Sequence, residues 1–220
     1  DVVVFQELMN YTRDQLEEES HYWNHSYAIV HKEEGMGMGI TSRHPINVRE
    51  VITDGMHHGL IYCHIEGIDI IATHLWPRFD ERILEEVNQV ISRVQQSKEE
   101  GHQVIVLGDL NALSPEDDPF LSEETLGLYT NHWKWKLEND RPSYQVIQAL
   151  LDAGLRDVYV PFMEEMVQKE YRVDYIFASP SLADQCVRAE NHTGEDFRKL
   201  SDHFPVSAEF NLKSWLKKTQ

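Results

Sequence analysis

The chain has 220 residues, of which 41% are hydrophobic and 26% are charged, with only 11 glycines and 8 prolines. These proportions are typical of a globular protein and exclude a fibrous or a disordered chain. Chains of this length often form one domain in β-rich architectures. We therefore expect a single domain over residues 1–220.

Acidic residues outnumber basic residues by 38 to 20, which gives a formal net charge of −18. Such a charge opposes bulk attraction to nucleic acids and to anionic membranes. It still allows a local basic groove, or a metal ion that neutralises an anionic substrate. No apolar run approaches the roughly 18 residues that cross a bilayer, and no signal peptide opens the sequence. We therefore expect no transmembrane segment and a cytoplasmic location.

Strands are predicted where β-branched and aromatic residues form short apolar runs. The Glu66-Gly67 pair separates two alternating runs and predicts a tight hairpin, so antiparallel pairing is expected. The first run starts at residue 2 with nothing ahead of it, which indicates that the chain begins inside a domain. The expected strands are 2–6, 26–31, 37–42, 59–65, 68–73, 103–107, 172–178, 186–190 and 204–210.

Helical periodicity is clearest in residues 80–100, where apolar residues recur at intervals of three and four and Gly101 supplies a stop. A second helix is expected from Ser143, as its N-cap, to Gly154. A third and more polar helix is expected over about 8–18. Strands interleaved with a few helices predict an α/β sandwich, in which the sheets pack face to face and the helices cover the outside.

The segment between residues 111 and 142 is the least regular part of the sequence, because it mixes prolines, acidic residues and two tryptophans. A long loop of this kind is usually functional or mobile.

A fully apolar run over residues 104–107 predicts a buried strand, and Asp109 and Asn111 follow where it ends. Because they lie two positions apart, their side chains can point the same way. The sequence thus places a carboxylate and an amide together at a sheet edge. The alternative is an Asp/Asn turn that caps the next segment.

Asp174 lies inside an otherwise apolar strand. Burying an unpaired charge is costly, so Asp174 should have a cationic, hydrogen-bonding or metal partner. The Asp202-His203 pair, directly before another strand, offers such a partner, because carboxylates commonly orient catalytic histidines.

Two further strands end in polar groups, at Gln6-Glu7 and at Thr73-His74. A lone histidine after a strand is more often structural than catalytic. The repetition of acidic, amide and imidazole groups at four strand ends is what indicates an active site.

In this order, these segments resemble the signature of the endonuclease/exonuclease/phosphatase superfamily, over residues 1 to about 210. The resemblance implies a DNase I-like fold: a four-layered α/β sandwich of two packed mixed or antiparallel sheets flanked by helices. The segments that carry it are Gln6-Glu7, Thr73-His74-Leu75, Gly108-Asp109-Leu110-Asn111, Asp174-Tyr175-Ile176 and Ser201-Asp202-His203.

By this resemblance, Glu7 is the main ligand of a Mg²⁺ or Mn²⁺ ion and Asp202 contributes to the metal site, as oxygen donors suit such hard cations. Asp109, helped by Asn111, positions and deprotonates the attacking water or holds a second metal ion.

The resemblance also assigns roles to three residues around the phosphate. His203, oriented by Asp174, stabilises or protonates the phosphate oxygens. His74 hydrogen-bonds the phosphate or assists the leaving group. The family's first strand carries an asparagine at the metal site and lies upstream of the QE pair, so we expect that strand to be missing here.

Twelve histidines raise the possibility of a zinc site, but no His-Glu-x-x-His pair or paired-cysteine spacing occurs. Trp76, Trp133 and Trp135 could stack on a base or sugar, or could simply pack against the sheet.

The sequence therefore predicts a Mg²⁺- or Mn²⁺-dependent hydrolase of phosphate esters that acts by in-line attack of an activated water on a small molecule, nucleotide or lipid headgroup. One alternative is a DNA or RNA nuclease of the same family, which a basic stripe beside the metal site would favour. The other is a non-catalytic binding domain that has kept the fold, for which one or more site residues should be lost.

Overall fold

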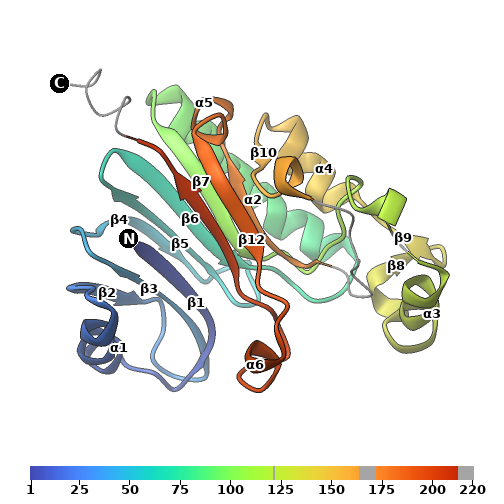
Figure 1. Cartoon of the computed structure of the whole chain (residues 1–220), viewed down its shortest axis with the longest axis horizontal. Coiled ribbons are helices and arrows are strands. Elements are labelled where there is room, and N and C mark those ends of the chain that lie inside the picture. The colour runs from blue at the N-terminus through green and yellow to red at the C-terminus, as the bar shows by residue number, and fades with distance from the viewer. Residues whose placement is uncertain (121, 164–171, 213–220) are drawn as a thin grey trace.

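The computed structural model describes residues 1–120, 122–163 and 172–212 and shows a mixed α/β fold (Figure 1). Its central layer is a six-stranded sheet in which all neighbours are antiparallel except β6 and β7. In spatial order, the strands are β10 (Arg156–Asp157), β11 (Asp174–Ala178), β7 (Gln103–Asp109), β6 (Ile68–His74), β5 (Leu60–Ile65) and β4 (Asn47–Ile52).

A second layer of strands packs on one face of this sheet. It consists of a three-stranded sheet and a two-stranded sheet, both antiparallel. Side chains from both layers share one apolar core, which includes Ile40, Ile61, Ile105 and Ala189. The strands of this layer are β1 (Val2–Met9), β3 (Met36–Ser42) and β2 (Tyr27–Val30), followed by β12 (Cys186–Asn191) and β13 (Val206–Phe210).

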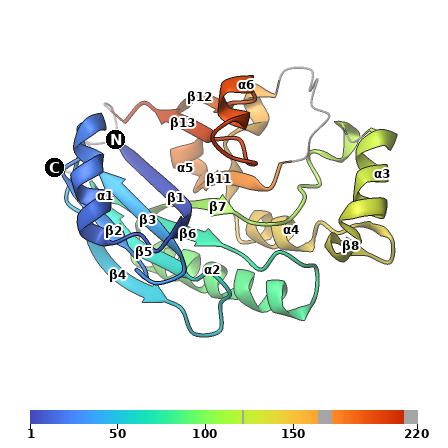
Figure 2. The same cartoon turned by 90° about the horizontal axis from the view of Figure 1, so that it is seen from below.

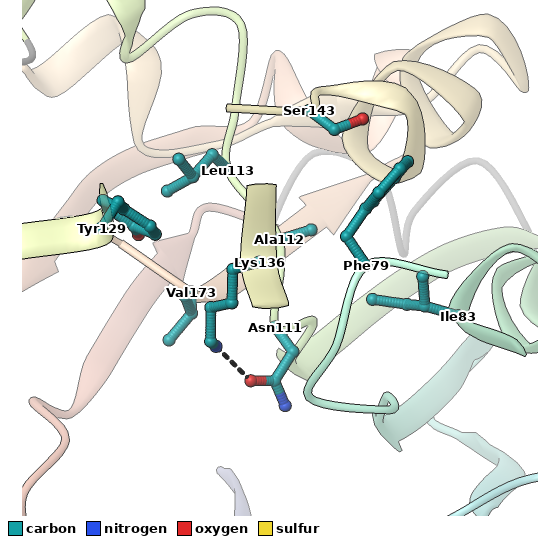
Figure 3. A pocket seen from close by; sticks show the side chains of 9 residues that line it. All are labelled: Phe79, Ile83, Asn111, Ala112, Leu113, Tyr129, Lys136, Ser143 and Val173. Carbon is teal, nitrogen blue, oxygen red and sulfur yellow. Dashed lines mark hydrogen bonds between the residues drawn. The ribbon is translucent and has the colours of Figure 1, made fainter. Parts of the chain in front are cut away.

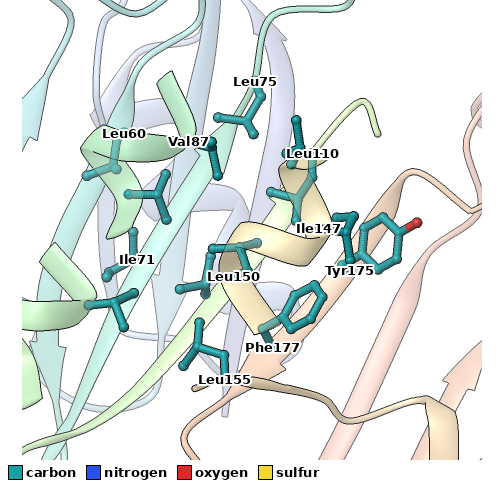
Figure 4. Packing of buried hydrophobic residues seen from close by; sticks show 14 of the residues in the cluster. Leu60, Ile71, Leu75, Val87, Leu110, Ile147, Leu150, Leu155, Tyr175 and Phe177 are labelled. Atoms are coloured by element: carbon teal, nitrogen blue, oxygen red, sulfur yellow. The ribbon is translucent and has the colours of Figure 1, made fainter. Parts of the chain in front are cut away.

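Helices cover the opposite face of the six-stranded sheet. α2 (Glu81–Glu99) and α4 (Gln145–Asp152) contribute Val87, Ile147 and Leu150 to a second apolar core, where they meet Ile71 and Phe177 of the sheet (Figure 4). α1 (Arg13–Ser20) lies beside β2 and β3 and buries Leu16 (Figure 2). The layers are therefore helices, sheet, sheet and helix, which confirms the predicted DNase I-like sandwich.

The predicted strands are all present, with ends shifted by at most three residues, and Glu66 and Gly67 form the expected hairpin turn with φ of 48° and 82°. The helix at 80–100 is confirmed: Asp80 caps its N-terminus by accepting from the Arg82 backbone, and Gly101 follows in a left-handed conformation.

Two helix predictions were partly wrong. The helix expected at 8–18 begins only at Arg13, after Thr12 as N-cap, because β1 continues through Met9. α4 begins at Gln145 without a side-chain cap, and the Ser143 hydroxyl has no hydrogen-bond partner among the described residues.

The strand β4 was not predicted, because it is an edge strand whose mixed polar and apolar residues are largely exposed and carry no clear alternation. The segment 111–142 is more regular than expected. It contains α3 (Glu123–His132) and the short strands β8 (Leu137–Glu138) and β9 (Arg141–Pro142).

Within the described residues, no helix is long and apolar enough to cross a membrane. The helices not yet named are short. These helices are α5 (Pro180–Ala183), α6 (Glu195–Arg198) and the 3₁₀ turns His21–Trp23, Asp118–Phe120, Lys134–Lys136 and Val160–Phe162.

Candidate active site

Three of the predicted site residues lie side by side at one edge of the six-stranded sheet. Asp109 ends β7 and pairs in register with His74 at the end of β6. On its other side it pairs with Asp174 at the start of β11. Because directly paired residues point to the same face of a sheet, the two carboxylates and the imidazole converge. Parallel pairing of β6 with β7 is what brings these two strand ends together.

The strand β1 is fastened to this edge by the side chain of Gln6. Its Nε2 donates to the Thr73 carbonyl at 3.0 Å, and its Oε1 accepts from the Asp109 backbone N–H at 3.0 Å. This close approach requires a glycine at position 108. A Cβ there would lie 1.9 Å from the Thr73 oxygen and 2.3 Å from Gln6 Nε2, and the Gly108 φ is +136°.

Glu7 follows Gln6 in a bulge, where the register of β1 with β3 shifts between Phe5 and Leu8. Its φ of 56° re-aims the side chain, which is exposed. Asp202 is also exposed. In the described part of the chain, no hydrogen bond or ion pair joins Glu7 or Asp202 to the other predicted site residues. Their assignment as metal ligands therefore stays a prediction.

Asn111 and Asp109 form a tight polar turn. The Asn111 backbone N–H donates to Asp109 Oδ1 at 2.8 Å, and Asn111 Nδ2 donates to Asp109 Oδ2 at 3.2 Å and to the Leu75 carbonyl at 2.9 Å. The φ of Asn111 is +50°, a conformation that asparagine tolerates better than most residues. The Asp/Asn turn that the sequence offered as an alternative is thus present. His74 also contacts this turn, because its Nε2 lies 3.3 Å from Asp109 Oδ2.

Asp109 is buried, and burial together with the nearby Asp174 carboxylate raises its pKa well above the usual carboxyl range. The cations of His203 and Lys136 oppose this shift. A carboxylate with a raised pKa is a stronger proton acceptor than an ordinary one, which suits a general base.

The predicted partnership of Asp174 with His203 is present. Asp174 Oδ2 lies 2.7 Å from His203 Nδ1. This hydrogen bond raises the pKa of His203 to about 9, against the opposing effect of burial. At neutral pH the ring is therefore an imidazolium, and its Nε2 can donate to an anionic oxygen.

His74 has the opposite electrostatics. It is 3% exposed, and burial, with a further contribution from His58, lowers its pKa to about 3. The His58 ring stacks on it with centroids 3.8 Å apart. His74 is therefore neutral, and its Nδ1 is buried without a hydrogen-bond partner among the described residues.

Sequence reasoning missed the residue that anchors the loops beside His74. The buried carboxylate of Glu86 accepts from the His57 backbone N–H at 2.6 Å and from the Trp76 backbone N–H at 2.7 Å. The guanidinium carbon of Arg82 lies 4.3 Å from the centroid of the Trp76 ring. The Trp76 indole therefore packs against a cation of α2. The Trp135 side chain, in contrast, is 47% exposed to solvent.

Lys136 is the second residue that sequence reasoning missed. It comes from the irregular segment before β8, and its Nζ donates to Asn111 Oδ1 at 2.6 Å (Figure 3). Desolvation lowers the pKa of Lys136, while Asp109 and Asp174 raise it. The only advance signal was the composition of 111–142, which marked that segment as functional or mobile.

The donor chemistry of this edge fits a hard divalent cation. Two carboxylates, the buried Asp109 and the half-buried Asp174, lie beside each other and concentrate negative charge, and oxygen donors are what Mg²⁺ and Mn²⁺ prefer. Glu7 and Asp202 would complete the set if they turn toward it.

Among the described residues, the group whose side chains lie close enough together to hold a metal ion is His64, Asp69 and His102. It lies at the opposite end of β6 and β7, away from His74. A cation already fills it, because the Arg49 guanidinium donates to Asp69 Oδ2 at 2.8 Å. His64 Nδ1 lies 2.7 Å from Asp69 Oδ1. This cluster is therefore a satisfied polar network.

Residues 1–203 match the model of the endonuclease/exonuclease/phosphatase family. Because this match covers most of the chain, the protein belongs to that family. No curated protein matches the sequence.

Solved structures of the same fold include three informative neighbours. An AP endonuclease from Archaeoglobus fulgidus superposes with a TM-score of 0.72 at 22% identity, covering 96% of this chain and 89% of its own. A variant of the 3′ phosphatase NExo from Neisseria, bound to a product DNA hairpin, gives 0.67 at 20% identity, with coverage of 96% and 89%. An endonuclease/exonuclease/phosphatase from Beutenbergia cavernae gives 0.60 at 16%, with coverage of 94% and 61%.

Proposed function

We propose that this protein is a Mg²⁺- or Mn²⁺-dependent hydrolase of phosphate esters. The observation that carries the proposal is the juxtaposition of Asp109, a buried carboxylate with a raised pKa, and the His203 imidazolium held by Asp174. A base and a cationic donor at one sheet edge are what water attack on a phosphate ester requires.

In the proposed mechanism, the charge of each site residue determines its role. Asp109, oriented by Asn111, accepts a proton from the attacking water. The His203 imidazolium donates to a phosphate oxygen and stabilises its developing charge. Neutral His74 can donate a hydrogen bond to the phosphate or to the leaving-group oxygen. A divalent cation, held by Glu7 and Asp202 with Asp109, would neutralise charge on the phosphate.

A nuclease of the same family is the second candidate. Two of the structural neighbours are an AP endonuclease and a 3′ phosphatase bound to a product DNA hairpin. The formal charge of −18 argues against a long nucleic acid as substrate. A small phosphodiester, a nucleotide or a lipid headgroup therefore remains our first proposal. A purely binding domain is disfavoured, since each site residue expected within this sequence is present.

The test is hydrolysis of a panel that contains bis-p-nitrophenyl phosphate, plasmid DNA, RNA and sphingomyelin, with Mg²⁺, Mn²⁺ or EDTA. Wild type is compared with Glu7→Ala and His203→Ala. Exposed residues supply matched controls, Glu99→Ala and His21→Ala.

We expect metal-dependent turnover that both site substitutions abolish and both controls retain. The preferred substrate then separates a phosphodiesterase from a nuclease. Absence of turnover on every substrate, together with absence of metal binding by calorimetry, would contradict the enzymatic proposal and leave the binding domain.

A further inference from the structure

The side-chain amide of Asn111 can face only one way. Its Nδ2 donates to two acceptors, the Leu75 carbonyl and Asp109 Oδ2. With the nitrogen fixed on that side, Oδ1 must face a donor or a cation, because an amide oxygen only accepts. Asn111 is 8% exposed, so an unmatched oxygen there would be costly. The place beside Oδ1 is therefore built for a positive or donating group.

Lys136 provides that group from a distant part of the chain. Its Nζ lies 2.6 Å from Asn111 Oδ1, a distance typical of a charge-assisted hydrogen bond. The stretch that carries it is fastened to the loop after β6, since the Phe79 backbone N–H donates to the Trp135 carbonyl at 2.8 Å. Figure 3 shows the Lys136 side chain reaching toward Asn111 along a small recess.

The same ammonium interacts electrostatically with Asp109 and Asp174. Two cations, Lys136 and His203, therefore interact favourably with these two carboxylates. A divalent ion that used Asn111 Oδ1 as a ligand would have to sit beside the ammonium, and like charges at such a short distance repel strongly in a partly buried site.

We propose that the Lys136 ammonium is a fixed cation of the reaction site, which hydrogen-bonds a phosphate oxygen of the substrate and takes the position that a second metal ion would need beside Asn111. The proposal rests on the proposed phosphoesterase function and deepens it. It makes the site a one-metal site, with the lysine as a permanent second positive charge.

The experiment compares wild type, Lys136→Met and Lys136→Arg. Lys134→Met is the matched control, because Lys134 is an exposed lysine two residues away that pairs with Asp140 at 2.8 Å. Titration calorimetry counts the Mn²⁺ ions bound per chain and measures the affinity for inorganic phosphate at saturating Mn²⁺. The kcat and KM on bis-p-nitrophenyl phosphate are measured beside it, and thermal melts verify that each variant is folded.

We expect one Mn²⁺ per chain in wild type, Lys134→Met and Lys136→Arg. Lys136→Met should bind a second Mn²⁺, lose at least tenfold in phosphate affinity and lose most of its kcat at low Mn²⁺, while Lys136→Arg recovers part of both. Two Mn²⁺ ions in wild type would overturn the proposal. An unchanged metal count and phosphate affinity in Lys136→Met would overturn it as well.

The two binding measurements involve no turnover. If no substrate is hydrolysed, the proposed function fails, and the metal count and phosphate affinity still decide the role of Lys136. If turnover is robust but the wild-type site holds two metal ions, only the inference about Lys136 fails.

Discussion

Replacing Gly108 by alanine should separate the two strand layers at the active site. The added Cβ would fall 1.9 Å from the Thr73 carbonyl oxygen and 2.3 Å from Gln6 Nε2, so β1 must move away. That movement breaks the two Gln6 hydrogen bonds to Thr73 and Asp109. It also withdraws Glu7, the predicted metal ligand, from the sheet edge.

The expected loss of stability has two parts. The Gly108 φ of +136° lies in a region that other residues rarely populate, at a cost of about 1–3 kcal/mol, and each lost hydrogen bond costs about 1 kcal/mol. The sum is about 3–5 kcal/mol, which a domain with a typical unfolding free energy of about 5–15 kcal/mol can survive. The variant should therefore fold and yet bind Mn²⁺ poorly.

The measurement is urea unfolding followed by circular dichroism, together with Mn²⁺ titration calorimetry. Gly101→Ala is the control, because Gly101 has a φ of +77° and nothing within 4 Å of its added Cβ, so it reports backbone strain alone. If both variants lose the same stability and both keep wild-type Mn²⁺ affinity, the contact of β1 with β7 does not position the site.

Three further predictions concern buried groups. The Arg172 guanidinium lies 2.6 Å from the buried Asp117 carboxylate and 2.8 Å from the buried Asp157 carboxylate. Arg172→Met leaves both carboxylates without this partner and should lower the free energy of unfolding, measured in urea, by about 3–5 kcal/mol. An unchanged urea midpoint would contradict this. His74 keeps a pKa of about 3 when folded but titrates near 6.5 when unfolded, so only the unfolded chain gains this proton as pH falls, and this residue alone contributes about 2 kcal/mol less stability at pH 5 than at pH 8. Because His203, whose pKa is raised to about 9, contributes in the opposite direction, the His74 contribution is measured by urea unfolding as the difference between wild type and His74→Asn at the two pH values; equal pH dependence in the two proteins would contradict it. Burial raises the pKa of the Cys63 thiol to about 12, so the folded chain should protect it from a disulfide reagent at pH 8 and urea should expose it; rapid modification of native Cys63 would refute its burial.

The sequence predicted the parts of the site that depend on strand ends. Apolar strands that end in polar groups are visible in one dimension. The parallel pairing of β6 with β7, which places His74 beside Asp109, was not predicted and is seen only in the structure. The partnership of Asp174 with His203 was also predictable, because a carboxylate in an apolar strand needs a nearby partner.

Lys136 and Glu86 could not be found in this way. Lys136 lies 25 positions along the chain from Asn111, in a segment without periodicity. Glu86 looks like an ordinary polar position of α2, and only the packed structure shows its carboxylate turned inward onto backbone N–H groups. Ser143 failed as a predicted cap because the helix begins at Gln145, so that Tyr144 and not Ser143 occupies the N-cap position.

The most direct test of the account is the rate of bis-p-nitrophenyl phosphate hydrolysis by wild type and by Asp174→Asn, with Mn²⁺ and with EDTA. We expect wild-type turnover that depends on Mn²⁺ and a kcat lower by about 100-fold or more in the variant, because His203 loses the carboxylate that keeps it charged. Equal, metal-independent rates for the two proteins would contradict the proposed chemistry.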